Sequence, residues 1–367
     1  MGACFFLLGI CFASWGSRIP TVQQSLGLSE TELGGVLFSL PVGLILSLPF
    51  TGWLTPKLGS RNVLTIGLLL YATTLITLGL AQNAWQLVLG LFVFGFASNM
   101  SNIAVNTQAV GVEHLYHKSI MASFHGLWSL AGFTGAAIGT FMIGINVIPF
   151  HHFLIMFAVI AVGLALAFRY LLPHDAATNP DQPLFVMPDK SLLMLGLIAF
   201  CSLICEGAMF DWSGVYFQKV VKAEKAWVAA GYTAFLGTMA FTRFIADWLT
   251  EKIGLKRVLQ LSGTFTTLGL LISVALPTMA TAILGFLLVG AGISSVVPLV
   301  YGVAGKSKTM TPSMALAAVS TIGFAGFLVG PPLIGLVAGI SSLRVSFFII
   351  AIMGMCVVFF STRAKIN

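Results

Sequence analysis

The sequence predicts an all-α integral membrane protein of twelve transmembrane helices, arranged as two parallel six-helix repeats. Two observations support this prediction. Of the 367 residues, 58% are hydrophobic and only 8% are charged, whereas soluble domains average about 25% charged residues. A charged turn at 52–64 also recurs in register at 247–259, with Trp, Leu, Thr, Lys, Gly, a basic residue, Val and Leu at matching places. An internal repeat of this kind indicates a duplicated structural unit.

Twelve apolar segments are long enough to cross the bilayer. A hydrocarbon core of ~30 Å needs about 20 helical residues, and the in/out alternation of a membrane β-barrel is not visible in the chain. The first segment has no basic region and no cleavage site, so we expect a true helix there. The predicted helices lie at about 3–22, 33–54, 62–81, 85–108, 120–144, 148–171, 191–217, 226–248, 258–276, 279–304, 311–338 and 341–362.

One extended polar stretch, 172–190, contains four prolines and three aspartates and reads as a flexible connector. It separates a predicted N-terminal bundle, 1–171, from a C-terminal bundle, 191–367. Six helices separate the two copies of the turn, an even number, so both copies face the same side of the membrane. Lys and Arg are concentrated on that side, which predicts a cytoplasmic linker and cytoplasmic termini in a bacterial-type inner membrane.

Composition excludes several functional classes. The net charge of +7 reports orientation in the membrane, and we expect no nucleic-acid partner. The five cysteines lie in apolar segments and match no zinc spacing, so no metal or cofactor is predicted. No nucleophile with a base is apparent, which argues against an enzyme. We expect a monomer that contacts lipid and a small solute, with a non-transporting scaffold as a weaker alternative.

The repeated turn resembles the loop signature of the major facilitator superfamily. Gly52, Leu54, Lys57, Gly59 and Arg61 fit that signature. The usual acidic position is Pro56 in the first copy, whereas the second copy has Glu251. Any acidic lock in these loops is therefore expected to be asymmetric and to rest on Asp247 and Glu251.

Four further motifs narrow the resemblance to the fucose-permease-like, YbjJ-like branch of that superfamily. They lie at 13–20, 124–130, 206–212 and 327–332. The resemblance implies the twelve-helix fold of the superfamily and alternating access driven by an ion or solute gradient. The repeated turns would then form inner gate loops, with these candidate residues: Lys57, Gly59, Arg61, Arg243, Asp247, Glu251, Lys252 and Gly254.

Glu206 is the first candidate for proton coupling. At ~1.5 Å per residue it lies roughly 22 Å into the seventh predicted helix, still within the hydrocarbon core. An ionised carboxylate there is costly unless it is paired or faces water. Either arrangement suits a proton-coupled carrier, and the alternative is a structural glutamate bonded to a neighbouring helix.

Arg18 and Asp211 are predicted near the outer ends of the first and seventh helices. They occupy corresponding places in the two halves. We therefore hypothesise that they pair and close an outer gate. The alternative is that each side chain reaches water separately.

The fourth predicted helix carries a polar stripe of Asn99, Asn102, Asn106 and Glu113, which fall within about 60° on a helical wheel. Such a stripe faces a bundle interior or a water-filled path. Amides both donate and accept hydrogen bonds, as a hydroxyl-rich solute requires. The stripe therefore predicts a solute pathway, with bonding between helices as the alternative.

His125, Trp15 and Trp212 complete the predicted pathway. Histidine can relay protons near neutral pH, although a buried neutral histidine bonded to Glu113 or a backbone carbonyl is equally compatible. The indole rings could stack on a sugar-like ring, or could lie at the membrane interface.

Together these features predict a secondary transporter for a small polar organic solute, with a sugar-like molecule as the leading guess and proton symport as the coupling mode. The alternative is a proton-coupled drug or metabolite exporter. Such exporters usually carry a Gly-Pro signature in the fifth helix, where this chain has Gly135 and Ala136.

Overall fold

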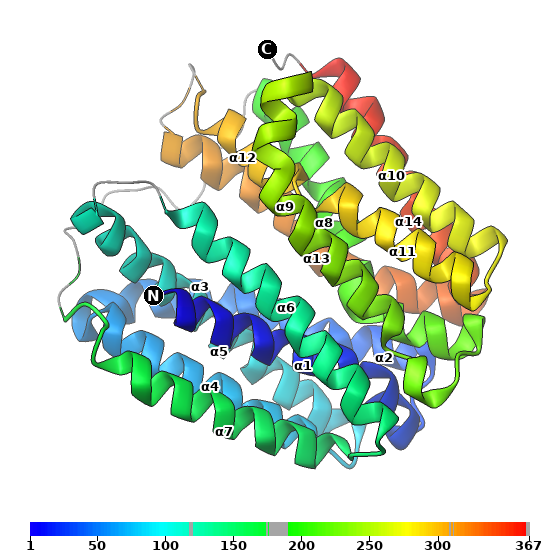
Figure 1. Cartoon of the computed structure of the whole chain (residues 1–367), viewed down its shortest axis with the longest axis horizontal. Helices are drawn as coiled ribbons and strands as arrows, with labels where there is room; N and C mark the ends of the chain where they lie inside the picture. Colours follow the sequence, from blue (N-terminus) through cyan, green and yellow to red (C-terminus); the bar gives the residue numbers. More distant parts are fainter. Residues whose placement is uncertain (117–119, 174, 176–189, 308–309, 311, 365–367) are drawn as a thin grey trace. The chain divides into compact units, whose positions relative to one another are not determined.

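The computed structural model is built of helices, and the residues it describes contain no strand (Figure 1). It describes the chain except for 117–119, 174, 176–189, 308–309, 311 and 365–367. Most of the predicted linker therefore lies outside the described residues. The first half contains α1 (Gly2–Leu26), α2 (Glu30–Leu37), α3 (Ser39–Leu58), α4 (Ser60–Leu78), α5 (Ala84–Tyr116), α6 (Met121–Gly144) and α7 (Pro149–Phe168).

The second half repeats this succession of long helices. Two short segments, a π-helical turn η1 (Phe217–Val221) and a 3₁₀ turn η2 (Lys225–Trp227), follow its first helix. The remaining elements are α8 (Lys190–Tyr216), α9 (Ala230–Ile253), α10 (Leu255–Ala275), α11 (Met279–Ile293), α12 (Val296–Ala304), α13 (Pro312–Ile340) and α14 (Leu343–Arg363).

Two of the predicted helices are each divided in two by the structure. The segment predicted at 33–54 breaks at Phe38, and the one predicted at 279–304 breaks at Ser294 and Ser295. Proline explains both breaks, because it has no N–H to donate to the carbonyl four residues before it. Pro41 leaves the carbonyl of Leu37 without its helical donor, and Pro298 does the same to Ser294.

Eleven spans of the described residues are long and apolar enough to cross a membrane, when α2–α3 and α11–α12 each count as one. The remaining long helix is α9, of 24 residues. Its second half carries Arg243, Asp247, Glu251 and Lys252, which lower its apolar character. With α9 the helices correspond one to one with the twelve predicted segments, and the all-α transmembrane fold class is confirmed.

The chain forms two compact units. Unit 1 comprises Met1–Thr178 and Glu224–Ala229, and unit 2 comprises Asn179–Ala223 and Ala230–Asn367. In unit 1, α1 packs on α6, α3 and α4 pack on α5, and α7 packs on α4. In unit 2, α8 packs on α13, α9 and α10 pack on α11, and α14 packs on α10. Each helix of the second repeat thus has the same partner as its counterpart.

Glycines permit the closest of these equivalent contacts. A Cβ on Gly95 of α5 would overlap the carbonyl of Leu40 in α3, and a Cβ on Gly290 of α11 would overlap the carbonyl of Phe235 in α9. Leu40 and Phe235, like the two glycines, occupy equivalent positions of the repeat. Close approach of backbones gives the van der Waals contact that holds membrane helices together.

The segment Glu224–Ala229 differs from the predicted division of the chain. The sequence places it in the C-terminal bundle, 191–367, but it packs with unit 1 against the end of α6. Lys225 Nζ donates to Asn146 Oδ1 over 2.7 Å. Asn146 has a φ of 60°, a conformation that asparagine tolerates better than most residues.

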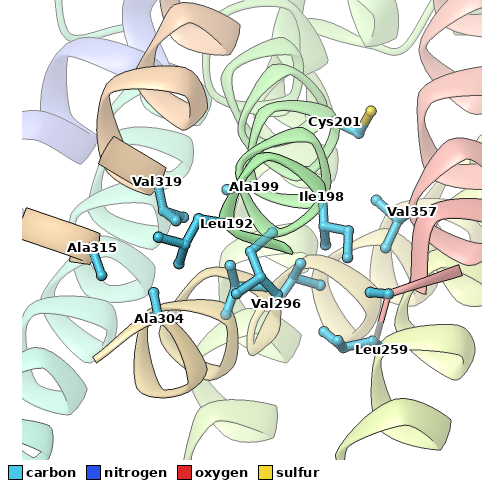
Figure 2. Packing of buried hydrophobic residues seen from close by; sticks show 13 residues of the cluster. Leu192, Ile198, Ala199, Cys201, Leu259, Val296, Ala304, Ala315, Val319 and Val357 are labelled. Carbon is cyan, nitrogen blue, oxygen red and sulfur yellow. The ribbon is translucent and has the colours of Figure 1, made fainter. Parts of the chain in front are cut away.

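The core of unit 2 is tightly packed and apolar (Figure 2). Side chains from α8, α10, α12, α13 and α14 meet there, among them Ile198, Leu259, Val296, Val319 and Val357. Cys201 belongs to the same cluster and is 3% exposed. It serves there as a small apolar side chain, which is the use that its sequence context predicts.

The repeated turn has one geometry in both units. Gly59 (φ 77°, ψ 147°) joins α3 to α4, and Gly254 (φ 86°, ψ 146°) joins α9 to α10. The amide of Gly59 donates to the carbonyl of Thr55 over 2.9 Å, and that of Gly254 to Thr250 over 3.0 Å. Both backbones occupy a region that is essentially restricted to glycine.

A basic residue of each turn bonds the end of the last helix in its unit. Arg61 Nη2 donates to the carbonyl of Phe168, at the end of α7, over 3.1 Å. At the equivalent position Lys256 Nζ donates to Thr362, near the end of α14, over 2.9 Å. A cation at a helix C-terminus satisfies carbonyls that lack helical partners. The turn therefore joins α4 to α7 in unit 1 and α10 to α14 in unit 2.

Asp175 supplies the acid that the first turn lacks at Pro56. The amide of Ser60 donates to Asp175 Oδ2 over 2.8 Å, and the Ser60 hydroxyl also bonds this carboxylate. Gln108 holds the chain nearby, since its Nε2 donates to Leu172 O over 2.9 Å and its Oε1 accepts from Leu172 N over 2.8 Å. This acid comes from a distant part of the sequence and caps α4, whereas the predicted acidic lock of Asp247 and Glu251 in the second turn stays a prediction.

We predict that Gly59→Ala and Gly254→Ala each lower the melting temperature of the purified protein in detergent. The backbone strain is worth about 1–3 kcal/mol, and no atom lies within 4 Å of either added Cβ, so the loss isolates the backbone term. Gly52→Ala is the control, because Gly52 lies inside α3 with equally open space and alanine favours a helix. Equal melting temperatures for all three variants would contradict the assignment.

Asp175→Ala is expected to lower the stability of the protein by about 0.5–2 kcal/mol, the usual cost of losing a helix cap. Thermal melting measures this loss. Glu251→Ala removes an exposed carboxylate from the other turn and is expected to leave the melting temperature unchanged. A loss in Glu251→Ala as large as that in Asp175→Ala would refute the cap.

Candidate functional site

The candidate site is centred on an ion pair in unit 2 between a buried acid and a half-buried arginine. Glu206, on α8, is 7% exposed. Its Oε1 lies 3.7 Å from Nη2 of Arg243 on α9. Arg243 Nε also donates to the carbonyl of Ser294 over 3.0 Å. One guanidinium therefore links α8, α9 and the break between α11 and α12.

The local sequence explains why this carbonyl is available. Pro298 removes the helical donor of Ser294, so the carbonyl can accept from a side chain. Arg243 was predicted among the inner gate residues. Its partners are instead the predicted coupling acid and this broken helix, which sequence spacing alone did not show.

The surroundings of Glu206 combine small, aromatic and polar groups. Gly207 lies against Phe327 of α13, whose ring would be 2.9 Å from an added Cβ, and Phe327 stacks on Phe210 at 6.5 Å between ring centroids. Cys205 Sγ donates to the carbonyl of Ile350 over 3.5 Å. Tyr301 of α12 lies close enough to interact electrostatically with Glu206, and its buried hydroxyl has no hydrogen-bond partner among the described residues.

Arg18 is buried in unit 1 and does not lie at the end of its helix. It is 1% exposed, and α1 continues to Leu26, so Arg18 is not at the helix end where the sequence analysis placed it. Its Nε donates to Nδ1 of His152 on α7 over 3.1 Å. His152 was not among the predicted site residues. Its position in an otherwise apolar helix was the one sequence feature that indicated a buried polar partner for it. Its predicted partner Asp211 is partly buried in α8 of the other unit, and the pairing stays a prediction.

The polar stripe of α5 divides into separate roles. Asn99 Nδ2 donates to Ser47 Oγ over 2.7 Å and to Leu44 O over 3.1 Å, so it joins α5 to α3, as the alternative interpretation described. Asn102 is exposed, and its Oδ1 accepts from Asn106 Nδ2 over 3.1 Å. These two amides remain candidates for a pathway.

Glu113 caps the next helix. Its Oε1 accepts from the amides of Ile120 and Met121 over 2.7 and 2.9 Å, at the start of α6. The helical wheel placed Glu113 with the asparagines, but a carboxylate at a helix N-terminus gains from unpaired amides and from the helix dipole. Glu113 therefore has a capping role, which the sequence analysis did not expect, and its place in the pathway stays a prediction.

His125 is exposed on α6 and packs edge-on against Phe5 at 5.4 Å between ring centroids. This excludes the alternative of a buried histidine. Trp15 and Trp212 are 1% and 0% exposed, so neither ring lies open to a solute or to the membrane interface in this structure. Within the described residues, both indole N–H groups are without a hydrogen-bond partner.

The inner gate candidates bond within their own units. Lys57 lies 3.8 Å over the ring of Trp53, and the equivalent Lys252 lies 4.9 Å over Trp248. Glu251 is exposed, and the side chain of Asp247 lies outside what the structure describes.

Metal ligation has no support in the described part of the chain, where no group of three or more His, Cys, Asp or Glu side chains could hold an ion. The five cysteines are free thiols.

Comparisons with known proteins agree with this architecture. The family model described as Major Facilitator Superfamily matches residues 1–308 and, in a second match, 220–365. An uncharacterized MFS-type transporter of Yersinia pestis is 32% identical over 349 residues, 95% of this chain and 91% of that protein. The quinolone resistance protein NorA of Staphylococcus aureus is 25% identical over 175 residues, 47% of this chain and 44% of that protein.

Solved structures show the same fold. The nucleoside transporter NupG has a TM-score of 0.74 at 14% identity and covers 99% of both chains. The fucose:proton symporter FucP of E. coli has a TM-score of 0.63 at 16% identity and covers 100% of this chain and 98% of its own. These findings fit the fucose-permease-like branch that the motifs indicated. The chain belongs to the major facilitator superfamily and is a multi-pass membrane transporter of that family.

Proposed function

We propose that this transporter carries a small polar organic solute, sugar-like in character, by alternating access with proton symport. The observation that carries the proposal is the pair of the buried Glu206 and the half-buried Arg243, 3.7 Å apart, which bridges α8 to α9. Only 8% of the residues are charged. Charged side chains inside a membrane helix bundle are energetically costly, and those that occur there usually mark functional sites.

The pair can couple a proton to a change of helix contacts. When a proton binds to a carboxylate oxygen of Glu206, the negative charge that offsets Arg243 disappears. Arg243 keeps its bond to the carbonyl of Ser294 but loses its attraction to Glu206, which is unfavourable for a half-buried cation. A rearrangement that lets Arg243 reach water or another acceptor relieves this cost. Protonation of Glu206 would thus favour one arrangement of α8 and α9 over another.

The sugar-like character of the solute rests on weaker support. Asn102 and Asn106 present amides on the surface of α5, and amides suit hydroxyl-rich molecules because they donate and accept. The names of two proteins of the same fold refer to a nucleoside and to fucose with a proton.

The bias of Lys and Arg between loops supports an inner-membrane location with both termini cytoplasmic, and the similar transporter of Yersinia pestis is bacterial. Both repeats lie within one chain, so a monomer is sufficient.

An exporter is the second candidate, favoured by the similarity to the quinolone resistance protein NorA over 175 residues. In proteoliposomes a symporter and an antiporter move protons in opposite directions relative to the solute. The direction of the pH change inside vesicles after solute addition therefore separates the two proposals.

We predict that Glu206→Gln abolishes proton-driven accumulation of solute while retaining exchange of solute across the membrane. The amide imitates the protonated acid and cannot release its proton. The solute is first identified by a thermal-shift screen of sugars, polyols, nucleosides and hydroxy acids on the purified full-length protein. Uptake is then measured in proteoliposomes with an imposed pH gradient.

Glu224→Gln is the matched control, because it makes the same change at an exposed position and is expected to accumulate solute normally. If Glu206→Gln accumulates solute to the wild-type level with unchanged pH dependence, Glu206 is not the coupling residue.

A further inference from the structure

The pair formed by Arg18 and His152 is a positive site without a counter-charge among the described residues of unit 1. Arg18 is 1% exposed and His152 is 0% exposed. Arg18 Nε donates to His152 Nδ1 over 3.1 Å, and α1, α6 and α7 meet around the pair. A Cβ on Gly139 of α6 would overlap Ser17 and lie 3.6 Å from His152 Cε1, so the three helices are in close contact here.

Every described carboxylate of unit 1 lies elsewhere. Glu32 bonds the Ser29 amide at the start of α2, Glu113 caps α6 and Asp175 caps α4. Glu30 has a contact of its own. Glu224 is exposed, whereas Arg18 is fully buried. None of these acids neutralises the guanidinium.

The hydrogen bond also fixes the tautomer of the histidine. A guanidinium nitrogen always donates, so Nδ1 of His152 accepts and its proton resides on Nε2. Two buried donors are then left over, Nη2 of Arg18 and Nε2 of His152, and neither has a hydrogen-bond partner within the described parts of the chain. Buried polar groups are nearly always satisfied, so each such exception requires an explanation.

We propose that the missing acceptor is an oxyanion of the transported solute, a carboxylate, and that the solute is therefore an acidic sugar or a related hydroxy acid. This proposal rests on the proposed function, since it names the class of the solute that the transporter carries. Water could satisfy a donor but could not neutralise the buried charge, which is the larger cost. Arginine matches a carboxylate with two parallel N–H donors, and Nη2 is free to take part.

The test is binding to the purified full-length protein in nanodiscs, measured by thermal shift and by titration calorimetry. The probes are glucuronate and galacturonate, compared with glucose and galactose, and with sodium chloride and inorganic phosphate as simple anions. We expect stabilisation by the sugar acids and at least tenfold weaker binding of the neutral sugars. Arg18→Gln is expected to weaken sugar-acid binding by tenfold or more, because the charge-assisted hydrogen bond is lost.

Arg169→Gln is the control, because Arg169 belongs to the same unit, is exposed and lies 4.9 Å from the centre of the Tyr170 ring; it is expected to bind sugar acids normally. If Arg18→Gln does not fold, Arg18→Lys keeps the charge and is expected to bind sugar acids, with reduced affinity. Loss of proton-driven accumulation in Glu206→Gln tests the proposed function, whereas loss of sugar-acid binding in Arg18→Gln tests this proposal, so the two failures are distinguishable.

Several outcomes would overturn the proposal. Binding of neutral sugars as tight as that of sugar acids, absence of binding to any sugar acid, or undiminished binding in Arg18→Gln would each do so. Stabilisation by chloride or phosphate without any further effect of the sugar acids would indicate a site for inorganic ions instead. Rescue of the melting temperature of Arg18→Asp by Asp211→Arg, together with no sugar-acid binding, would identify Asp211 as the counter-charge.

Discussion

The burial of charge in an apolar environment is the constraint on which this structure depends. Glu206 and Arg243 compensate each other inside unit 2, and a proline frees the Ser294 carbonyl to accept from Nε of the same guanidinium. The break between α11 and α12 is thus part of the same device as the ion pair. The polar second half of α9, which makes that helix the least apolar of the long ones, is consistent with this role.

The two repeats keep their packing and differ in their charges. Both units have the glycine turn and a lysine over a tryptophan ring. In both, a basic residue of the turn also donates to a carbonyl near the end of the last helix. Unit 2 holds a neutral ion pair, whereas unit 1 holds a guanidinium against a neutral histidine. If the proton binds in unit 2 and the anionic group of the solute binds in unit 1, then proton coupling and solute recognition belong to different repeats.

The acids of the turns show how a duplicated motif can diverge without losing its structure. Pro56 occupies the position in the first turn where an acid is expected. Asp175, which follows α7 in the sequence, instead provides a carboxylate at the start of α4. A cap needs only an acceptor at the N-terminal amides of the helix. The acceptor can therefore come from any segment of the chain that packs against the start of the helix.

Sequence alone determined the class of protein, the positions of the twelve helical segments and the duplication, because hydropathy and a repeated turn are properties of neighbouring residues. It also identified Glu206 as a buried acid. Only the tertiary structure decided which groups meet: Arg243 with Glu206, His152 with Arg18, Glu113 with α6, and Asn99 with α3. Helical spacing defines a face of one helix, but the partner of that face depends on how separate helices pack, and this is why the polar stripe divided into unrelated contacts.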